Sequence, residues 1–310
     1  METHTPMIES VPNVSEGHDT TVVSAIADAV RAVPAVLLLD HSSDPSHNRS
    51  VFTMAGAAAP LLDALLRLAE AAIARVDLRV HRGVHPRIGA VDVVPLIPLG
   101  GSTMAACVDL SHQLARALAD RFGLPVYLYE HSASRPTRRR LEVIRRGHFE
   151  GLAEKMKRPE WAPDYGPAVP HPTAGATVVG ARMPLIAYNV NLDSTDLEVA
   201  RAVALAVRES SGGLPCVKAL GLPLLHRGVA QVSMNLTDFT RTSVQEAFDA
   251  VVREAGARGV GVLESELIGL IPEAALVGTS AERLRLTGFT RAQILEERIA
   301  QRLAERPTRP

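Results

Sequence analysis

The length, composition and charge of the chain exclude several classes of protein. It has 310 residues, of which 46% are hydrophobic and 22% charged, and 33 basic residues are balanced by 34 acidic ones. This interspersed charge does not favour a nucleic-acid or membrane partner, and no stretch approaches the roughly 20 apolar residues of a membrane span. We therefore expect a soluble, cytoplasmic protein that acts on small molecules.

The two cysteines, Cys107 and Cys216, lie far apart in apolar segments. This placement predicts free core thiols rather than a disulfide, and a reducing compartment. The N-terminal stretch METHTPMIES has no apolar run that could serve as a secretion signal.

The first half of the chain alternates strand and helix patterns. In chain order we expect a strand at 8–11, a helix at 20–32, strands at 35–40 and 50–56 joined by a polar segment at 41–49, a helix opened by Pro60, a strand at 91–98, a helix at 103–122 and a strand at 126–130. A polar region rich in Arg, Pro and Gly follows at 134–166.

The second half repeats the same order of elements. We expect a strand at 185–192, a helix at 195–209, strands at 216–225 and 229–236 joined by a turn at 226–228, a helix at 244–257, a strand at 260–269, a peripheral helix at 290–303 and a disordered tail at 305–310. The pattern predicts an α+β protein of two ferredoxin-like β-α-β-β-α-β subdomains, spanning 1–180 and 181–310, with a ligand cleft between them.

The stretch GVHPRIGAVDVVPLIP, residues 83–98, places a histidine between flexible and rigid residues at the entrance to a strand. His81 and His85 have the spacing of zinc ligands on a helix, but Gly83 and Pro86 disfavour that helix, so we predict no metal. His85 is either a polar loop residue or a proton carrier working near neutral pH, and composition alone does not decide between them.

Three other segments carry polar or unusual residues. The Pro- and Gly-rich stretch 163–182, which follows the only tryptophan, is either a linker or a loop shaped to wrap a flat ligand. The segment 43–53 is a solvated turn or a polar cluster. Asn189 and Asn191 alternate onto one face of an otherwise apolar strand, as a structural network or as ligands of a polar molecule.

These stretches resemble the formiminotransferase domain family over nearly the whole chain. The matching segments, in chain order, are ESVPNVSEG, SDPSHNRSVFT, HRGVHPRIGAVDVVPLIP, VPVYLYE, IRRGHFEGL, WAPDYGPAVPHPTAGATVVGAR, PLIAYNVNL, VRESSGG, AQVSMNL and SELIGLIP. The resemblance implies two ferredoxin-like subdomains, in agreement with the order of elements.

The resemblance also implies a transferase of one-carbon metabolism in histidine degradation. Its reaction moves a formimidoyl group between 5-formimidoyltetrahydrofolate and L-glutamate, with tetrahydrofolate as co-substrate and no metal. The chain ends without a cyclodeaminase domain, so a separate cyclodeaminase is expected. A homodimer is compatible with the sequence.

Site residues follow from the same resemblance. The proton-transferring histidine of the family falls on His85, and its folate-contacting loop falls on Gly166, Pro167, Ala168, Val169, Pro170, His171, Pro172, Thr173, Ala174 and Gly175. We expect the backbones of Gly166 and Gly175 to lie against the folate. The further candidates for substrate binding are Asp40, Ser42, Arg49, Arg87, Arg182, Asn189 and Asn191. The three arginines are not carried over from the family; they are chosen because a guanidinium group can bind a substrate carboxylate in bidentate fashion.

One segment departs from the family pattern. Relatives commonly carry acidic residues where this chain has Ser42 and Ser46, in a segment that in this family approaches the active site. The change leaves two alternatives beside the family reaction: a relative that uses a different amine, or a non-catalytic protein that binds folate.

Overall fold

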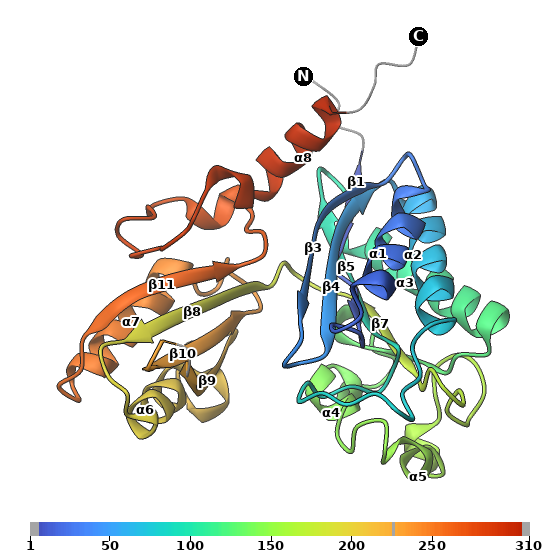
Figure 1. The fold of residues 1–310 in the computed structure, drawn as a ribbon, viewed down its shortest axis with the longest axis horizontal. Coiled ribbons are helices and arrows are strands. Elements are labelled where there is room, and N and C mark those ends of the chain that lie inside the picture. The colour runs from blue at the N-terminus through green and yellow to red at the C-terminus, as the bar shows by residue number, and fades with distance from the viewer. Residues whose placement is uncertain (1–5, 225–226, 306–310) are drawn as a thin grey trace. The chain divides into compact units, whose positions relative to one another are not determined.

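A computed structural model describes residues 6–224 and 227–305 (Figure 1). The chain divides into two compact units, Met1–Arg182 and Met183–Pro310. Each unit is built on its own sheet with helices packed against it, so the structure is mixed α+β. Most of the tail expected to be disordered, and His226 of the expected turn, lie outside the described residues.

The first unit has a seven-stranded sheet. In chain order its elements are β1 (Met7–Ser10), β2 (Asn13–Val14), α1 (Thr20–Arg31), β3 (Leu37–Asp44), β4 (Arg49–Gly56), α2 (Ala58–Ile73), β5 (Val91–Leu99), α3 (Met104–Phe122), β6 (Val126–Leu128) and β7 (Thr177–Ala181). Both β1 and β2 pair with β4 and β5, and β3 lies outside β4. β7 extends the sheet beyond β5 by parallel pairing, and β6 pairs with β7 in the same way.

Helices α1, α2 and α3 bury their apolar stripes against one face of this sheet. Ile26, Leu65 and Leu114 of the three helices share a core with Phe52 and Leu96 of β4 and β5. Asp19 and Thr103 accept hydrogen bonds from the first free N–H groups of α1 and α3, which fixes where these helices begin.

The polar region 134–166 contains short helical elements that the sequence pattern did not predict. These are α4 (Leu141–Ile144), α5 (Leu152–Met156) and two 3-10 turns, at Pro136–Arg138 and Pro159–Trp161, and a further 3-10 turn at Glu130–Ser132 precedes the region. Ile144 and Leu152 pack with Val93 and Tyr127 in a second core, on the sheet face opposite α1 to α3. Arg138, only 1% exposed, holds the region together by donating to Asp164 and to two main-chain carbonyls. Tertiary contacts of this kind are absent from local propensity, which is why the sequence pattern missed them.

The second unit has a four-stranded antiparallel sheet in the order β11-β8-β10-β9. Its elements are β8 (Ile186–Leu192), α6 (Leu197–Val207), β9 (Val217–Leu224), β10 (Val229–Leu236), α7 (Val244–Gly256), β11 (Val262–Ile268) and the C-terminal helix α8 (Leu295–Ala304). Helices α6 and α7 pack on one face, where Val203 and Phe248 meet Tyr188 and Val232. A capping box of Ser243 and Glu246 begins α7.

The segment 41–49 also differs from the prediction. β3 continues through His41, Ser42 and Ser43 to Asp44, so only residues 45–48 form the turn to β4. Polar side chains can continue this strand because β3 is at the edge of the sheet, where these three residues are exposed.

Both cysteines are free, as predicted, but only Cys107 is buried, while Cys216 is half-buried. Among the described helices, none is long and apolar enough to cross a membrane.

Candidate active site

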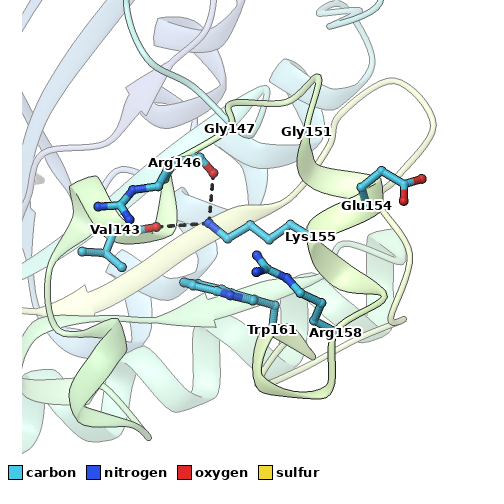
Figure 2. Close-up of a pocket in the computed structure, with 8 residues that line it drawn as sticks. All are labelled: Val143, Arg146, Gly147, Gly151, Glu154, Lys155, Arg158 and Trp161. Atoms are coloured by element: carbon cyan, nitrogen blue, oxygen red, sulfur yellow. Dashed lines mark hydrogen bonds between the residues drawn. The ribbon is translucent and has the colours of Figure 1, made fainter.

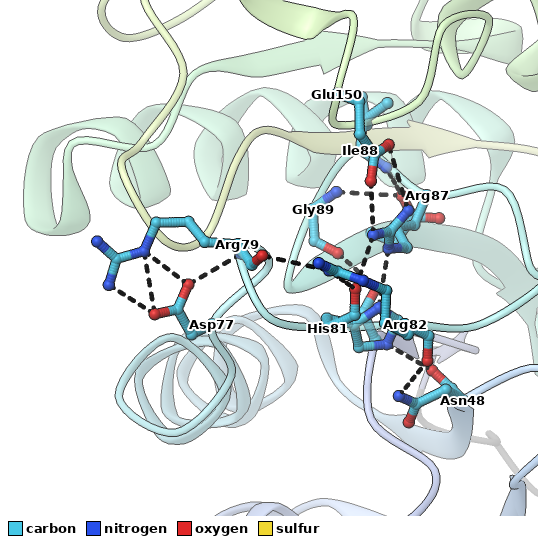
Figure 3. Close-up of polar contacts among 11 residues, drawn as sticks. Asn48, Asp77, Arg79, His81, Arg82, Arg87, Ile88, Gly89 and Glu150 are labelled. Atoms are coloured by element: carbon cyan, nitrogen blue, oxygen red, sulfur yellow. Dashed lines mark hydrogen bonds and ion pairs between the residues drawn. The ribbon is translucent and has the colours of Figure 1, made fainter.

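The loop between α2 and β5 carries His81, His85 and Arg87, and His81 anchors it. His81 is buried; its Nε2 donates to the Asn48 carbonyl at 2.9 Å, and its Nδ1 accepts from Arg87 Nε at 2.9 Å (Figure 3). Both ring nitrogens are therefore engaged, and burial lowers the pKa of His81, so the ring is neutral. The zinc-like spacing of His81 and His85 does not produce a metal site, because neither nitrogen of His81 is available to a metal.

Asn48 connects this loop to the β3–β4 turn. Its backbone has a φ of 49°, a left-handed conformation that asparagine tolerates. The buried side chain accepts from Gly17 N at 2.8 Å and donates to the Arg82 carbonyl at 2.7 Å. The segment 43–53 is therefore a structural junction as well as a turn.

Arg87 is also committed to the protein. It is 4% exposed, donates to the His81 carbonyl at 3.2 Å and pairs with Glu150 at 2.9 Å (Figure 3). We predicted it as a partner of a substrate carboxylate, but Glu150 already neutralises it. In this structure its guanidinium ties the His85 loop to the segment between α4 and α5.

Asp92, 1% exposed at the start of β5, fixes the backbone beyond His85. Its Oδ1 accepts from Ile88 N at 2.7 Å and from Gly89 N at 3.3 Å, and its Oδ2 accepts from Arg145. One carboxylate thus holds the turn that follows His85 and places a guanidinium beside it. Arg145 was missed at the sequence level; the only signal for it is its position in the matching segment IRRGHFEGL.

His85 lies half-buried among positive charges. Its ring stands edge-on to that of His47, with 6.2 Å between centroids, and none of the described residues hydrogen-bonds to it. Burial lowers the pKa of His85 to about 2, with further lowering by Arg145, Arg49, His47 and Arg87. At neutral pH the imidazole is uncharged and can accept a proton.

Two of these arginines have unsatisfied hydrogen-bonding capacity. The Nε atoms of Arg49 and Arg145 are buried and have no hydrogen-bond partner among the described residues. Burial lowers the pKa of Arg49, and Arg145 lowers it further, which places the two guanidinium groups near each other. Arg145 contacts Asp92, and no salt bridge joins Arg49 to a carboxylate in the described structure. The surroundings of His85 can therefore accept an anion, such as a carboxylate.

Ser42 and Asp40 lie on the same face of the sheet as Arg49. Residues directly opposite in an antiparallel pair share a face, and Ser42 opposes Val51, Asp40 opposes Thr53 and Asp44 opposes Arg49. His41 points to the other face, where it stacks on Phe52. Ser42 is two residues along from the Arg49 row, roughly 7 Å in the strand direction. The described residues offer its hydroxyl no hydrogen bond.

Arg182, directly after β7, hydrogen-bonds to the Tyr129 side chain. Burial raises the pKa of Tyr129, and the nearby positive charge of Arg145 opposes that rise. Arg182 therefore belongs to the same basic region, with a partner already in place.

The Pro- and Gly-rich loop is fixed at both ends and exposed between them. His171 and Gly175 exchange main-chain hydrogen bonds of 2.8 and 3.0 Å, and Ala90 N donates to the Ala174 carbonyl at 2.9 Å. The end of the loop thus lies directly beside the segment that follows His85. Residues 166–169 are exposed.

The two glycines of this loop have a structural explanation. Gly166 and Gly175 have φ values of 83° and 69°, and an added Cβ would lie 2.4 Å from the Leu124 carbonyl oxygen and 2.1 Å from that of Ile88. The need for glycine at both positions is thus explained by the protein's own carbonyls, and contact of these backbones with folate stays a prediction. Substitution there would damage folding first, so it would not test folate binding.

Asn189 and Asn191 lie in the second unit, in rows that cross its sheet. Asn191, fully buried, donates to Glu264 at 3.0 Å and accepts from Gln231 at 2.9 Å, while Asn189 donates to Glu266 at 3.1 Å. The structural-network interpretation therefore accounts for the amide groups without a ligand.

Comparison with known proteins agrees with the resemblance in the sequence. The model of the formiminotransferase domain, N-terminal subdomain, matches residues 7–182, and that of the formiminotransferase domain matches 187–301. Glutamate formimidoyltransferase of Streptococcus pyogenes serotype M1 is 43% identical over 94% of this chain and 98% of its own length. The enzyme of the same name from Thermoplasma acidophilum is 42% identical over 94% and 97%.

A longer relative matches over part of its length. Formimidoyltransferase-cyclodeaminase of Sus scrofa is 43% identical over 89% of this chain and 52% of the pig protein. Both family models and the full-length relatives thus cover nearly all of this sequence. The chain belongs to the formiminotransferase domain family.

Proposed function

We propose that this protein is a glutamate formimidoyltransferase, which transfers the formimidoyl group of N-formimidoyl-L-glutamate to tetrahydrofolate. The observation that carries the proposal is a neutral imidazole, His85, beside two guanidinium groups with unpartnered Nε atoms. Histidine breakdown supplies this donor, and the reaction places the protein in cytoplasmic one-carbon metabolism.

The reaction requires two proton transfers, one from the nitrogen that attacks the amidine carbon and one to the nitrogen that leaves it. N5 of tetrahydrofolate attacks the amidine carbon, forming a new C–N bond and losing its proton to His85. The C–N bond to the glutamate nitrogen then breaks, and His85 returns the proton to that departing nitrogen. The products are 5-formimidoyltetrahydrofolate and L-glutamate, and no electrons enter or leave. A single group that is neutral at the start can serve both steps.

The basic groups around His85 would hold the amino-acid part of the donor. Among residues 6–224 and 227–305, no carboxylate forms a salt bridge with Arg49, and no acceptor is bonded to the Nε of Arg145, which contacts Asp92 through its terminal nitrogen. Both suit a substrate carboxylate better than Arg87, which Glu150 occupies. Asp40, Ser42 and Arg182 would contribute from the edges of this site.

Tetrahydrofolate, as co-substrate, would lie along the loop Gly166–Gly175. Support comes from the position of the loop end beside the His85 segment and from the exposure of residues 166–169. We further propose that both units are ferredoxin-like subdomains, 1–180 and 181–310. The sheet order β11-β8-β10-β9 supports this for the second unit. No metal takes part, and a homodimer is compatible with the proposal.

The test is a spectroscopic assay of the purified protein with tetrahydrofolate and N-formimidoyl-L-glutamate. We expect formation of a one-carbon folate adduct that requires both substrates. Folate binding without adduct formation would contradict the proposal and indicate a non-catalytic folate binder. If an adduct forms with another formimidoylated amine but not with N-formimidoyl-L-glutamate, the protein is a relative that uses a different amine, the alternative that Ser42 suggested.

A further inference from the structure

Lys155 is a buried cation that pairs with no carboxylate in the part of the chain that the structure describes. It lies in α5 and is 7% exposed. Its Nζ donates to the carbonyls of Val143, Ile144 and Arg146 at 3.1, 2.6 and 3.1 Å. An ammonium group has three N–H donors, so this hydrogen-bonding capacity is fully used.

These carbonyls belong to the C-terminal end of α4, where a helix leaves its last carbonyls without intrahelical partners. A lysine side chain that hydrogen-bonds to them also interacts favourably with the negative end of the helix dipole. The Trp161 ring lies on another side of the ammonium, 3.8 Å from Nζ to the ring centroid. Figure 2 shows Lys155 reaching between the carbonyls of Val143 and Arg146, with Trp161 beneath it.

The three carbonyls flank Arg145, the residue that contacts Asp92 and adds to the positive charge at His85. Lys155 thus holds the peptide group that precedes Arg145 and the one that follows Arg146, so the backbone is fixed on either side of this residue. Building on the proposed function, we propose that Lys155 is a positioning residue: it holds Arg145 against Asp92 beside His85, and so sets how tightly the anionic donor binds.

The charge of Lys155 is sensitive to pH. Burial, with Arg158, Arg146 and Arg138 nearby, lowers the pKa of Lys155 from 10.5 to about 8. Lys155 and Trp161 line a surface pocket in which Glu154 is the acidic residue, and Glu154 pairs with Lys157 (Figure 2). Between pH 8 and 10.5 the unfolded chain binds one more proton at this lysine than the folded one, so deprotonation does not lower the stability of the fold. A neutral amine has one N–H donor fewer than an ammonium group. Deprotonated Lys155 therefore loses one of its three hydrogen bonds to the carbonyls at the end of α4, while the protein stays folded.

The test compares Lys155→Met, which keeps the length and removes the donors, with Lys155→Arg, which keeps the charge at all accessible pH values. Lys157→Met is the matched control, because Lys157 is an exposed lysine two residues away, 69% exposed and paired with Glu154. We expect Lys155→Met to raise the KM for N-formimidoyl-L-glutamate about tenfold, with kcat within a few-fold, and Lys155→Arg to restore KM. In wild type KM should rise above pH 8, and in Lys155→Arg it should not.

Two readouts do not need activity. Trp161 is the only tryptophan, so wild-type fluorescence should titrate with a midpoint near pH 8 that both Lys155 variants lack. In NMR spectra the pKa of His85 should rise in Lys155→Met, because Arg145 no longer lies firmly beside it. If wild type lacks formimidoyltransferase activity but these two changes occur, the proposed function fails and the positioning role stands. A folded Lys155→Met protein with wild-type KM and an unchanged His85 titration would overturn the positioning role.

Discussion

The two sheets carry different polar groups on the faces turned away from their main helices. In the first unit this face and its edges gather Arg49, Arg145 and Arg182 near a neutral His85. In the second unit the rows Gln231–Asn191–Glu264 and Ser233–Asn189–Glu266 run across the strands. The order of helices and strands is similar in the two halves, but their polar chemistry is not.

The faces also differ in how well their polar groups are satisfied. The amides of Asn189, Asn191 and Gln231 find partners in neighbouring strands. Arg49 and Arg145 instead keep buried Nε donors without partners. Because an unsatisfied buried donor costs about 1–3 kcal/mol, such groups point to a site that a ligand completes. We therefore expect changes in the first unit to affect function, and changes in the rows of the second to affect stability.

The largest effect is expected at His85. Replacing it with asparagine removes the proton carrier, so His85→Asn should lower kcat by about two orders of magnitude or more. Folate affinity should stay within a few-fold, since binding uses other groups. Steady-state kinetics and folate titration measure the two quantities, and the exposed His131→Asn serves as control. Near-normal turnover in His85→Asn would remove this residue from the mechanism.

Arg49 should affect donor binding more than folding. Arg49→Met removes a charge-assisted hydrogen bond to the donor carboxylate, worth about 1.5–3 kcal/mol, so KM should rise roughly ten- to a hundred-fold. Stability should change little, because no salt bridge joins the half-buried Arg49 to a carboxylate among the described residues. Kinetics and thermal unfolding are compared with those of the exposed variant Arg67→Met. An unchanged KM would assign the carboxylate to another residue.

Asn191 should show the reverse pattern. Asn191→Ala removes the hydrogen bonds of a fully buried amide to Glu264 and from Gln231, so the free energy of unfolding should fall by about 1–3 kcal/mol. KM for both substrates should stay within a few-fold. Denaturant unfolding and kinetics test this, with the exposed Asn235→Ala on β10 as a control. If Asn191→Ala instead raises KM strongly and leaves stability unchanged, the Gln231–Asn191–Glu264 row binds substrate and is not only a structural network.

The pH dependence of catalysis should differ between free and substrate-bound enzyme. In the free enzyme the pKa of His85 is lowered to about 2, chiefly by burial, so its base form persists throughout the neutral range. A bound carboxylate offsets the charge of Arg49 and Arg145 and raises that pKa. The pH profile of kcat reports the substrate complex and that of kcat/KM the free enzyme. Activity should therefore begin to fall at a higher pH in the kcat profile than in the kcat/KM profile as the solution is acidified. NMR titration of His85 with and without glutarate should show the same upward shift, and identical titrations would contradict it.

The same shift has a consequence for stability. The folded-state pKa of His85 lies below the value of 6.5 for an unperturbed histidine. Between these values the unfolded chain binds the extra proton. The contribution of His85 to stability is therefore present above pH 6.5 and is lost as pH falls toward 2.

The smallest effect is expected at Ser42, on the Arg49 face of β3. Restoring the acidic residue common in the family gives a charge-assisted contact to the donor or to the basic site, so Ser42→Asp should raise kcat/KM with N-formimidoyl-L-glutamate several-fold. Wild type should use another formimidoylated amine, such as that of glycine, at least as well. Competition kinetics with both donors test this, and the neighbour Ser43→Asp is the control. Efficient wild-type use of the glutamate donor and no gain in Ser42→Asp would refute it.

The sequence by itself determined the order of helices and strands and the position of the catalytic candidate. Hydrophobic periodicity is local, so it predicted elements such as α3 and β10 nearly to the residue. His85 was found from a short contiguous motif, in which the proline and glycine that shape its loop are neighbours in the chain.

Only the tertiary structure decided which groups surround His85. Asp92 and Arg145 are 53 residues apart, and Arg87 and Glu150 are 63 apart, so no local pattern pairs them. The same holds for Gly175, whose need for glycine comes from the carbonyl of Ile88 on a distant segment. Charge pairing and close backbone approach depend on how the chain packs, and packing is what periodicity and motif spacing leave undetermined.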